Sequence, residues 1–356
     1  MRHSGNEQYF ENLIRALLHA ADPTQQYFVF SYRAAAAALL PGDHAVHVPL
    51  RSRSVWWQRG VEIPQLSRRL DLDVLHVPFN FLPVGRCRKI VTIHDLGFLR
   101  MPHLYAPLER YRMRVLTRLA ARRADHILTG SALVKREIVE DYGVAPDRVT
   151  VAPYGVDSAV FRPLATEQRH VARQRLGLPD AYLLFVGVIQ ARKNLRVLLR
   201  ALEILRDRGR TDVHLVLAGR LGYGAEDVFR CVQQRGLAPV VRHLGVVPTD
   251  ALVGLYNNAL ALVFPSLLEG FGIPILEAMA SGCPVVSSNA AALPEVYGDA
   301  ALSFDPHDPE ELVLRLSQLL EDGALAQRLR ADGHRRAERF SWERAASAVR
   351  AVYAAS

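Results

Sequence analysis

Residues 263–286, VFPSLLEGFGIPILEAMASGCPVV, decide the fold of this chain. The apolar run that ends at Phe264 predicts a buried strand, and Pro274 is a favourable residue in the first turn of a helix. Another apolar run follows, so the stretch predicts a strand, a helix and a second strand. Between the first strand and the helix, Gly270 and Gly272 flank a loop whose backbone can approach a ligand closely.

Two glutamates eight positions apart give this stretch its chemistry. Glu269 lies in the glycine-flanked loop, and Glu277 lies about one turn into the predicted helix. The amino terminus of a helix presents free N–H groups and the positive end of a dipole to an anion. A carboxylate at the position of Glu277 can accept hydrogen bonds from vicinal hydroxyls, such as those of a ribose. We therefore expect a site for an anionic ligand that carries hydroxyl groups.

The same alternation runs along the rest of the chain. Short, apolar, β-branched segments are typical of buried parallel strands, and they alternate with amphipathic helical segments. The predicted strands are Tyr27–Phe30, Ala45–Val48, Val74–Val77, Ile90–His94, His126–Thr129, Val149–Ala152, Leu183–Val188, His214–Ala218, Val241–Leu244, Leu260–Phe264, Pro284–Ser287 and Leu302–Phe304. We expect an α/β fold with parallel sheets.

The spacing of these elements predicts two domains, as does the length of 356 residues. Residues 153–168, PYGVDSAVFRPLATEQ, are rich in turn formers and predict a linker, so we place the boundary near Pro163. A doubly wound domain usually opens with a strand. Here Gly5 leads directly into a predicted helix, Tyr9–His19, and we expect the first strand to be missing. Either a longer reading frame encodes it, or the sheet is built without it.

The composition is that of a globular protein, with 50% hydrophobic and 22% charged residues. The three cysteines lie far apart and form no C-x-x-C pair, which excludes a disulfide scaffold and a cysteine-based zinc knuckle. No apolar run is long enough for a transmembrane helix, and the first residues lack the apolar stretch of a signal peptide. We expect a cytoplasmic protein that is soluble or peripheral to the membrane.

Positive charge is concentrated in the first half of the chain. Residues 1–165 hold 22 Lys and Arg against 15 Asp and Glu, whereas residues 166–356 hold 22 against 21. Between Arg86 and Arg123, ten basic residues face two acidic ones. This pattern indicates a partner such as a nucleic acid, a membrane surface or a phosphate-bearing lipid, or else solvated arginines on helix faces. No nucleic-acid-binding motif accompanies the cluster, so we expect no nucleic acid partner.

The stretch 263–286 resembles the E-x7-E signature of retaining glycosyltransferases with the GT-B fold, the group 1 or family 4 type. The resemblance covers nearly the whole chain. Its other matches are VTIHDLGF (91–98), FVGVIQARKNLRVLL (185–199), LVLAG (215–219), LPEVYGDAAL (293–302) and RFSWERAA (339–346). The family implies two Rossmann-like domains that face a cleft. The domains are an acceptor-binding domain 1–163, a nucleotide-sugar-binding domain 164–338, and a helix 339–356 that crosses back to the first domain.

The resemblance also implies the reaction. A hexose, with mannose favoured, moves from a nucleotide sugar to a saccharide or polyprenyl-diphosphate-linked acceptor in polysaccharide biosynthesis, and no metal is needed for the transfer. GDP-mannose is the expected donor because the TIHDL and ARKN contexts resemble mannosyltransferases, and UDP-sugars are the alternative. The acceptor places the protein at the inner membrane face, and the cluster Arg86–Arg123 fits contact with an anionic membrane.

Residue by residue, the resemblance assigns a donor site in the second domain. Arg192 and Lys193 clamp the donor diphosphate, whose developing charge must be stabilised. Many relatives carry an additional arginine where this sequence has Val188. Glu277 binds the ribose hydroxyls, and Glu269 either stabilises the oxocarbenium-like charge or orients the sugar. The expected donor-binding residues are Gly187, Arg192, Lys193, Gly219, Gly245, Val246, Gly270, Phe271, Gly272, Ile273 and Glu277.

On the first domain, the resemblance assigns His94 as the catalytic partner of Glu269, in contact with the donor sugar. Independently, His94 is predicted at the carboxyl end of a strand, where ligands of open α/β sheets bind. Asp95 is expected to orient His94 or to contact the acceptor, and Gly5 and Ser131 are expected on the acceptor side.

Two other functions remain open at this point. A GT-B sugar-nucleotide 2-epimerase would turn over UDP-GlcNAc without an acceptor, and the signature LLEGFGIPILE argues against it. A non-catalytic nucleotide-sugar-binding subunit would bind the nucleotide and transfer nothing. Asp71-Leu72-Asp73 imitates a metal-binding D-x-D motif but precedes a predicted strand instead of following one. No H-E-x-x-H, G-x-S-x-G or P-loop motif is present.

Overall fold

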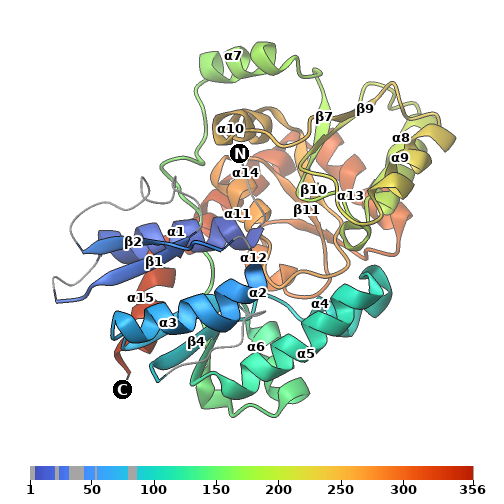
Figure 1. Cartoon of the computed structure of the whole chain (residues 1–356). Coiled ribbons are helices and arrows are strands. Elements are labelled where there is room, and N and C mark those ends of the chain that lie inside the picture. The colour runs from blue at the N-terminus through green and yellow to red at the C-terminus, as the bar shows by residue number, and fades with distance from the viewer. Residues whose placement is uncertain (1–4, 21–23, 32–43, 53, 79–85, 356) are drawn as a thin grey trace. The chain divides into compact units, whose positions relative to one another are not determined.

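The computed structural model describes residues 5–20, 24–31, 44–52, 54–78 and 86–355 (Figure 1). Contacts between residues divide the chain into two compact units. Unit 1 is the segment Gly155–Ser341, and unit 2 is Gly5–Tyr154 together with the chain from Trp342 onward. Along the sequence, the boundary between the two units falls between Tyr154 and Gly155, whereas we expected a domain boundary near Pro163.

Unit 1 contains a six-stranded sheet with the order β12-β11-β10-β7-β8-β9, in which every neighbouring pair is parallel. The strands are β7 (Tyr182–Val186), β8 (His214–Ala218), β9 (Val241–His243), β10 (Ala261–Phe264), β11 (Val285–Ser288) and β12 (Leu302–Phe304). Every residue of β7, β10 and β11 is buried, as expected for central parallel strands with helices on both faces.

A helix follows each of the first five strands, because parallel neighbours must be joined by crossovers. The helices of unit 1 are α7 (Thr166–Leu176), α8 (Leu195–Asp207), α9 (Ala225–Gln234), α10 (Thr249–Asn258), α11 (Ile273–Ala280), α12 (Leu293–Tyr297), α13 (Pro309–Glu321) and α14 (Gly323–Ala337), with a 3-10 turn at Ala191–Lys193. Within this unit α8 packs on α13, α10 on α7 and α11 on α14 (Figure 1).

Unit 2 contains two separate parallel sheets among its described residues. One has the order β3-β4-β5-β6, and the other pairs β1 with β2. The strands are β1 (Tyr27–Ser31), β2 (Ala45–Pro49), β3 (Val74–Pro78), β4 (Arg88–Thr92), β5 (His126–Thr129) and β6 (Val149–Val151). Phe30 of β1 packs against the buried core that the four-stranded sheet shares with its helices, so both sheets contribute to that core.

The helices of unit 2 are α1 (Gly5–His19), α2 (Val55–Trp57), α3 (Ile63–Arg69), α4 (Gly97–Arg100), α5 (Pro107–Arg123), α6 (Ala132–Tyr142) and α15 (Trp342–Ala354). A π-helical segment, Gln58–Glu62, joins α2 to α3, and short 3-10 turns lie at Pro102–Leu104 and Pro146–Arg148. α15 packs along α1, and the ring of the buried Trp342 lies 5.9 Å from the ring of Tyr9. No helix of the described residues is both long enough and apolar enough to cross a membrane.

The predicted fold class and all twelve predicted strands are confirmed, each strand within two residues of its expected bounds. One error affects the candidate site. We expected His94 to end a strand, but β4 ends at Thr92 and His94 lies two residues beyond it. The reason is local, because the carboxylate of Asp95 accepts a hydrogen bond of 3.0 Å from the N–H of Gly97 and turns the chain into α4.

Candidate active site

The sheet of unit 1 brings four of the expected donor-site segments to one edge. β10, β7, β8 and β9 are consecutive neighbours in the sheet and run parallel, so their carboxyl ends lie together. Gly187 follows β7, Gly219 follows β8, Gly245 follows β9, and Glu269 lies in the loop after β10. This is the edge at which ligands of open α/β sheets bind.

The close approach of two of these loops requires glycine at position 219. Gly219 has a φ of +146°, and a Cβ built there would lie 1.9 Å from the carbonyl oxygen of Gly187. The N–H of Gly219 donates a hydrogen bond of 2.7 Å to the carbonyl of Gly245, which ties the loop after β8 to the loop after β9. The backbone of these loops is therefore packed more closely than any other residue type would allow. Val246, in the loop after β9, is exposed.

Arg192 and Lys193 both pair with Glu269. Nη1 of Arg192 lies 3.0 Å from Oε2 of Glu269, and Nζ of Lys193 donates to Oε1 of the same carboxylate. Lys193 also lies over the ring of Phe264, 4.9 Å from its centre. Lys193 and Glu269 are both buried. The strand order explains the meeting, since β7 and β10 are neighbours although the paired residues lie 76 positions apart.

The charge of Glu269 is fixed by this pair of cations. Burial alone would raise the pKa of the carboxyl, but the charges of Arg192 and Lys193 outweigh it and hold the pKa at about 2. Glu269 is therefore ionised at neutral pH and has no proton to donate. The cluster carries two positive charges against one negative charge, which leaves it attractive to an anion.

Glu277 lies in α11, as expected, and is 1% exposed. Its Oε2 accepts a hydrogen bond of 2.9 Å from the hydroxyl of Tyr256 in α10, a partner that the sequence did not indicate. Gly272 precedes α11 with a φ of +121°. Phe271 is buried with its ring 5.9 Å from that of Phe340, so it offers a ligand its backbone and not its ring.

In unit 2, His94 is buried in a group of aromatic rings. Its Nδ1 lies 2.6 Å from the hydroxyl of Tyr154, and its ring packs edge-on against Tyr9 at 4.9 Å. Burial lowers the pKa of His94 to about 4, against a smaller opposing effect of Asp95. The imidazole is neutral at pH 7, and Tyr154 rather than Asp95 fixes its orientation. Tyr154 lies three residues beyond the end of β6, a position that could have been found from the carboxyl-end rule.

The remaining acceptor-side residues have local structural contacts. The hydroxyl of Ser131 caps α6 by accepting a hydrogen bond of 3.3 Å from the N–H of Val134. Asp95 caps the turn into α4, and Gly5 is the first residue of α1. These contacts explain why the residue types suit their positions, and the expected acceptor contacts remain predictions.

Unit 2 should lose stability as the pH falls from about 6.5 to 4.5. Burial lowers the pKa of His76 to about 3 and that of His94 to about 4, so the unfolded chain binds their protons first. The stabilisation is complete above the unfolded pKa and is lost as the pH falls, by roughly 2 kcal/mol for each histidine. Urea unfolding followed by tryptophan fluorescence measures this, because the three tryptophans, Trp56, Trp57 and Trp342, all belong to unit 2. An unchanged pH slope in His76→Gln, His94→Gln would contradict the assignment.

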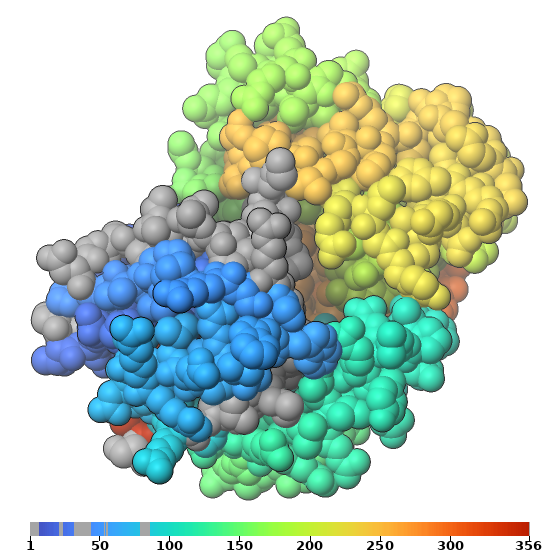
Figure 2. Space-filling model, viewed as in Figure 1, coloured from blue at the N-terminus to red at the C-terminus, as the bar shows by residue number. Residues whose placement is uncertain are grey.

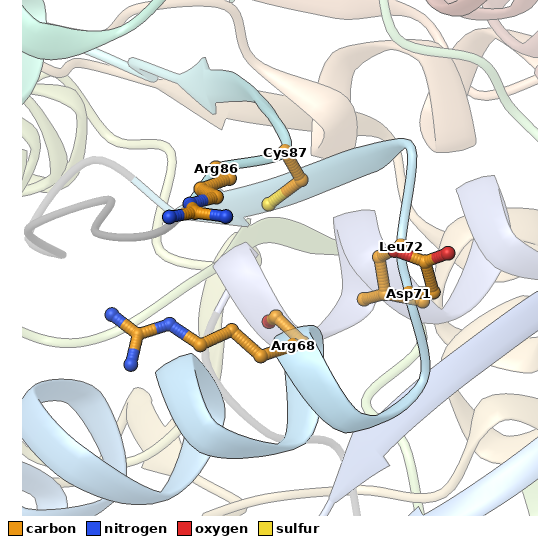
Figure 3. Close-up of a pocket in the computed structure, with 6 residues that line it drawn as sticks. Arg68, Asp71, Leu72, Arg86 and Cys87 are labelled. Atoms are coloured by element: carbon orange, nitrogen blue, oxygen red, sulfur yellow. The ribbon is translucent and has the colours of Figure 1, made fainter.

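A cavity of about 450 Å³ lies at the amino end of β4, and none of the candidate site residues named above lines it. Ser67, Arg68, Asp71, Leu72, Arg86 and Cys87 line it. Figure 3 shows the side chains of Arg68 and Arg86 extending to the same side of it. Asp71 belongs to the D-x-D sequence set aside above, and it precedes β3 as expected. Among the described residues, no group of three or more His, Cys, Asp or Glu side chains could hold a metal ion.

Both units match known protein families. Residues 167–336 match the family of glycosyl transferases group 1, and residues 4–160 match Glycosyltransferase Family 4. The chain is 34% identical over 271 residues to the O-antigen chain mannosyltransferase B of Escherichia coli, covering 76% of this chain and 71% of that protein. It is 33% identical over 347 residues to the MMP alpha-(1->4)-mannosyltransferase of Mycolicibacterium hassiacum, covering 88% and 80% of the two chains.

A solved structure extends the comparison to the fold. HepE of Anabaena, in complex with UDP-glucose, superimposes with a TM-score of 0.79 at 18% identity, over 99% of this chain and 96% of HepE. At this identity the likeness concerns the fold alone.

Proposed function

Because the chain belongs to the group 1 glycosyltransferases and has their GT-B fold, we propose that it transfers mannose from GDP-mannose, with retention of configuration, to a saccharide or lipid-linked saccharide in polysaccharide biosynthesis. Both relatives described above are named as mannosyltransferases, and this supports the choice of sugar.

The observation that carries the proposal is the cluster of half-buried Arg192 with buried Lys193 and Glu269 at the carboxyl edge of the sheet. A diphosphate leaving group needs positive charge that is already in place when the bond breaks. Arg192 and Lys193 supply it without an arginine at Val188, and the glycines beside them let a diphosphate approach the backbone. Glu277 is the carboxylate assigned to the ribose hydroxyls.

The ionised Glu269 suits the stabilisation of an oxocarbenium-like sugar better than proton transfer. Its pKa of about 2 keeps it charged through the reaction, and that charge favours positive charge developing on the sugar. His94, neutral at pH 7, suits a hydrogen bond to a sugar hydroxyl. We assign the acceptor side to unit 2 through Gly5, Asp95 and Ser131, on the resemblance alone, and we propose that the transfer needs no metal.

A thermal-shift panel with GDP, UDP, ADP and dTDP tests the donor. We expect GDP to stabilise the wild type most, by about 2.7 kcal/mol at 100 times its dissociation constant. The Glu277→Ala variant should lose 10-fold to 100-fold in GDP affinity, on the order of one charge-assisted hydrogen bond. Each melting temperature is compared with that of the same variant without ligand. Glu203→Ala is the matched control, because Glu203 is a carboxylate of unit 1 paired with Arg200 and Arg235.

Other outcomes change the conclusion in defined ways. Preferential stabilisation by UDP would replace GDP-mannose by a UDP-sugar. Turnover of UDP-GlcNAc without an acceptor would indicate the 2-epimerase. Donor binding without hydrolysis or transfer to any lipid-linked saccharide would indicate a non-catalytic subunit.

The proposal includes contact with the cytoplasmic face of a membrane, where a polyprenyl-diphosphate-linked acceptor would be found. The support is the excess of basic residues between Arg86 and Arg123 in unit 2.

A further inference from the structure

Two neighbouring tryptophans of unit 2 are exposed. Trp56 is 54% and Trp57 58% exposed in α2, whereas Trp342 is 5% exposed. Side chains of this size are usually buried, because each contributes a large apolar surface. No residue of the proposed donor or acceptor site lies in this segment, so their exposure needs another explanation.

A second exposed apolar group lies on α5. Leu108 is 70%, Tyr111 67% and Val115 38% exposed. Their spacing of three and four residues places them along one face of the helix. Two exposed arginines flank this face. They are Arg112, one helical turn after Leu108, and Arg118. The helix therefore presents apolar and cationic side chains together toward solvent.

The two groups form one surface. The guanidinium of Arg112 lies over the ring of Trp56, 4.8 Å from its centre, which joins α5 to α2. Burial, and then the charge of Arg112, lower the pKa of the neighbouring Arg59 guanidinium, so positive charges are crowded here. Figure 2 shows the segment around residues 55–70, in blue, and the α5 region, in teal, at the surface of unit 2. We call Trp56, Trp57, Leu108, Tyr111, Val115 and the arginines of α5 the α2–α5 surface.

The structure also divides the basic cluster Arg86–Arg123. Arg88 donates to the carbonyl of Val352, Lys89 pairs with Asp125, and Arg100 pairs with Glu137 and Asp141. The side chains of Arg88, Lys89 and Arg100 therefore already have hydrogen-bond or ion-pair partners within unit 2. The six arginines of α5 are Arg110, Arg112, Arg114, Arg118, Arg122 and Arg123, and the helix carries one acidic residue, Glu109. Within the ranges that the structure describes, these six arginines form no ion pair.

We propose that the α2–α5 surface docks the protein on an anionic lipid bilayer. Resting on the proposed function, this names the surface that brings the enzyme to a lipid-linked acceptor. Indole and phenol rings prefer the depth of the lipid headgroups, where one edge is wet and the other apolar. Arginine side chains bury their stems beside such rings while the guanidinium reaches lipid phosphates. The exposed tryptophans and the helix of six arginines therefore complement an anionic membrane, whose headgroup layer accommodates indole rings and guanidinium groups at one depth.

Vesicle co-sedimentation of the full chain tests this proposal. Neutral phosphatidylcholine vesicles are compared with vesicles that also contain phosphatidylglycerol, at low salt. We expect strong binding to the anionic vesicles only. The variant Arg112→Gln, Arg118→Gln, Arg122→Gln should lower the partition coefficient on the order of 100-fold, since each cation near the surface contributes about a factor of five. The variant Trp56→Ser, Trp57→Ser should lower it roughly tenfold, since binding also scales with buried apolar area.

A matched control removes the same charge elsewhere. The variant Arg169→Gln, Arg230→Gln, Arg328→Gln replaces three exposed arginines of unit 1 and should bind anionic vesicles within about twofold of the wild type. An equal loss in this control would overturn the proposal in favour of general charge attraction. Full binding by the double tryptophan variant would overturn it too. Self-association that both surface variants abolish would assign the surface to a second copy of the chain.

Donor binding separates this inference from the proposed function. The α2–α5 variants should bind GDP with wild-type affinity, because none of their substitutions lies in unit 1. Vesicle binding with no binding of GDP, UDP, ADP or dTDP would leave the docking surface standing and remove the proposed function. GDP binding with no vesicle binding would do the reverse.

Discussion

Replacing Glu269 with glutamine should lower the turnover number on the order of 100-fold to 1000-fold, the usual effect of removing one electrostatic contact to a transition state. The same substitution should leave the affinity for GDP unchanged or raise it several-fold. In the wild type, the carboxylate neutralises part of the charge of Arg192 and Lys193. Glutamine keeps the shape but not the charge, so the two cations become more attractive to a diphosphate. Single-turnover rates and GDP titration measure the two effects separately.

Glu203→Gln is the control for this experiment, since it removes a carboxylate that also pairs with two arginines of unit 1 but lies in α8. It should change neither rate nor affinity. A weaker affinity for GDP in Glu269→Gln, with the rate per bound donor unchanged, would show that Glu269 serves binding and not the chemical step.

Replacing Gly219 with alanine should destabilise unit 1 by more than about 3 kcal/mol and abolish GDP binding. The added Cβ would lie 1.9 Å from the backbone oxygen of Gly187, where no flexible side chain can yield. One of the two loops must move. The loop after β7 leads into the segment that holds Lys193, and the loop after β8 is hydrogen-bonded to it, so either shift would disturb that segment. Circular dichroism on heating, with GDP titration at low temperature, measures the loss.

Gly236→Ala separates steric contact from backbone strain. Gly236 has a φ of +65°, and a Cβ there would meet nothing within 4 Å, so only the left-handed backbone costs about 1 kcal/mol. If Gly219→Ala were no worse than Gly236→Ala, the close approach of the two loops would not be needed for stability.

The sequence predicted the elements of the candidate site more completely than their partners. The glycine-flanked loop with Glu269, the helix with Glu277 and the basic pair Arg192 and Lys193 each follow from local patterns. Tyr256 could not be found, because within its helix it looks like any other apolar core residue. The end of β4 was placed two residues too late, because His94 continues an apolar run and the hydrogen bond from Gly97 to Asp95 that turns the chain is invisible to that pattern.

The sequence by itself determined the order of strands and helices, the parallel α/β class and the family, since each depends on periodicity or on residues close together in the chain. Only the tertiary structure decided what those residues do to one another. It paired Lys193 with Glu269 across 76 positions, because β7 and β10 are neighbours in the sheet. It also distinguished the basic residues of unit 2 that have partners within the unit, Arg88, Lys89 and Arg100, from the arginines of α5, which form no ion pair among the described residues. The physical reason is that charge, pKa and exposure depend on distances in space, which the sheet order sets and sequence separation does not.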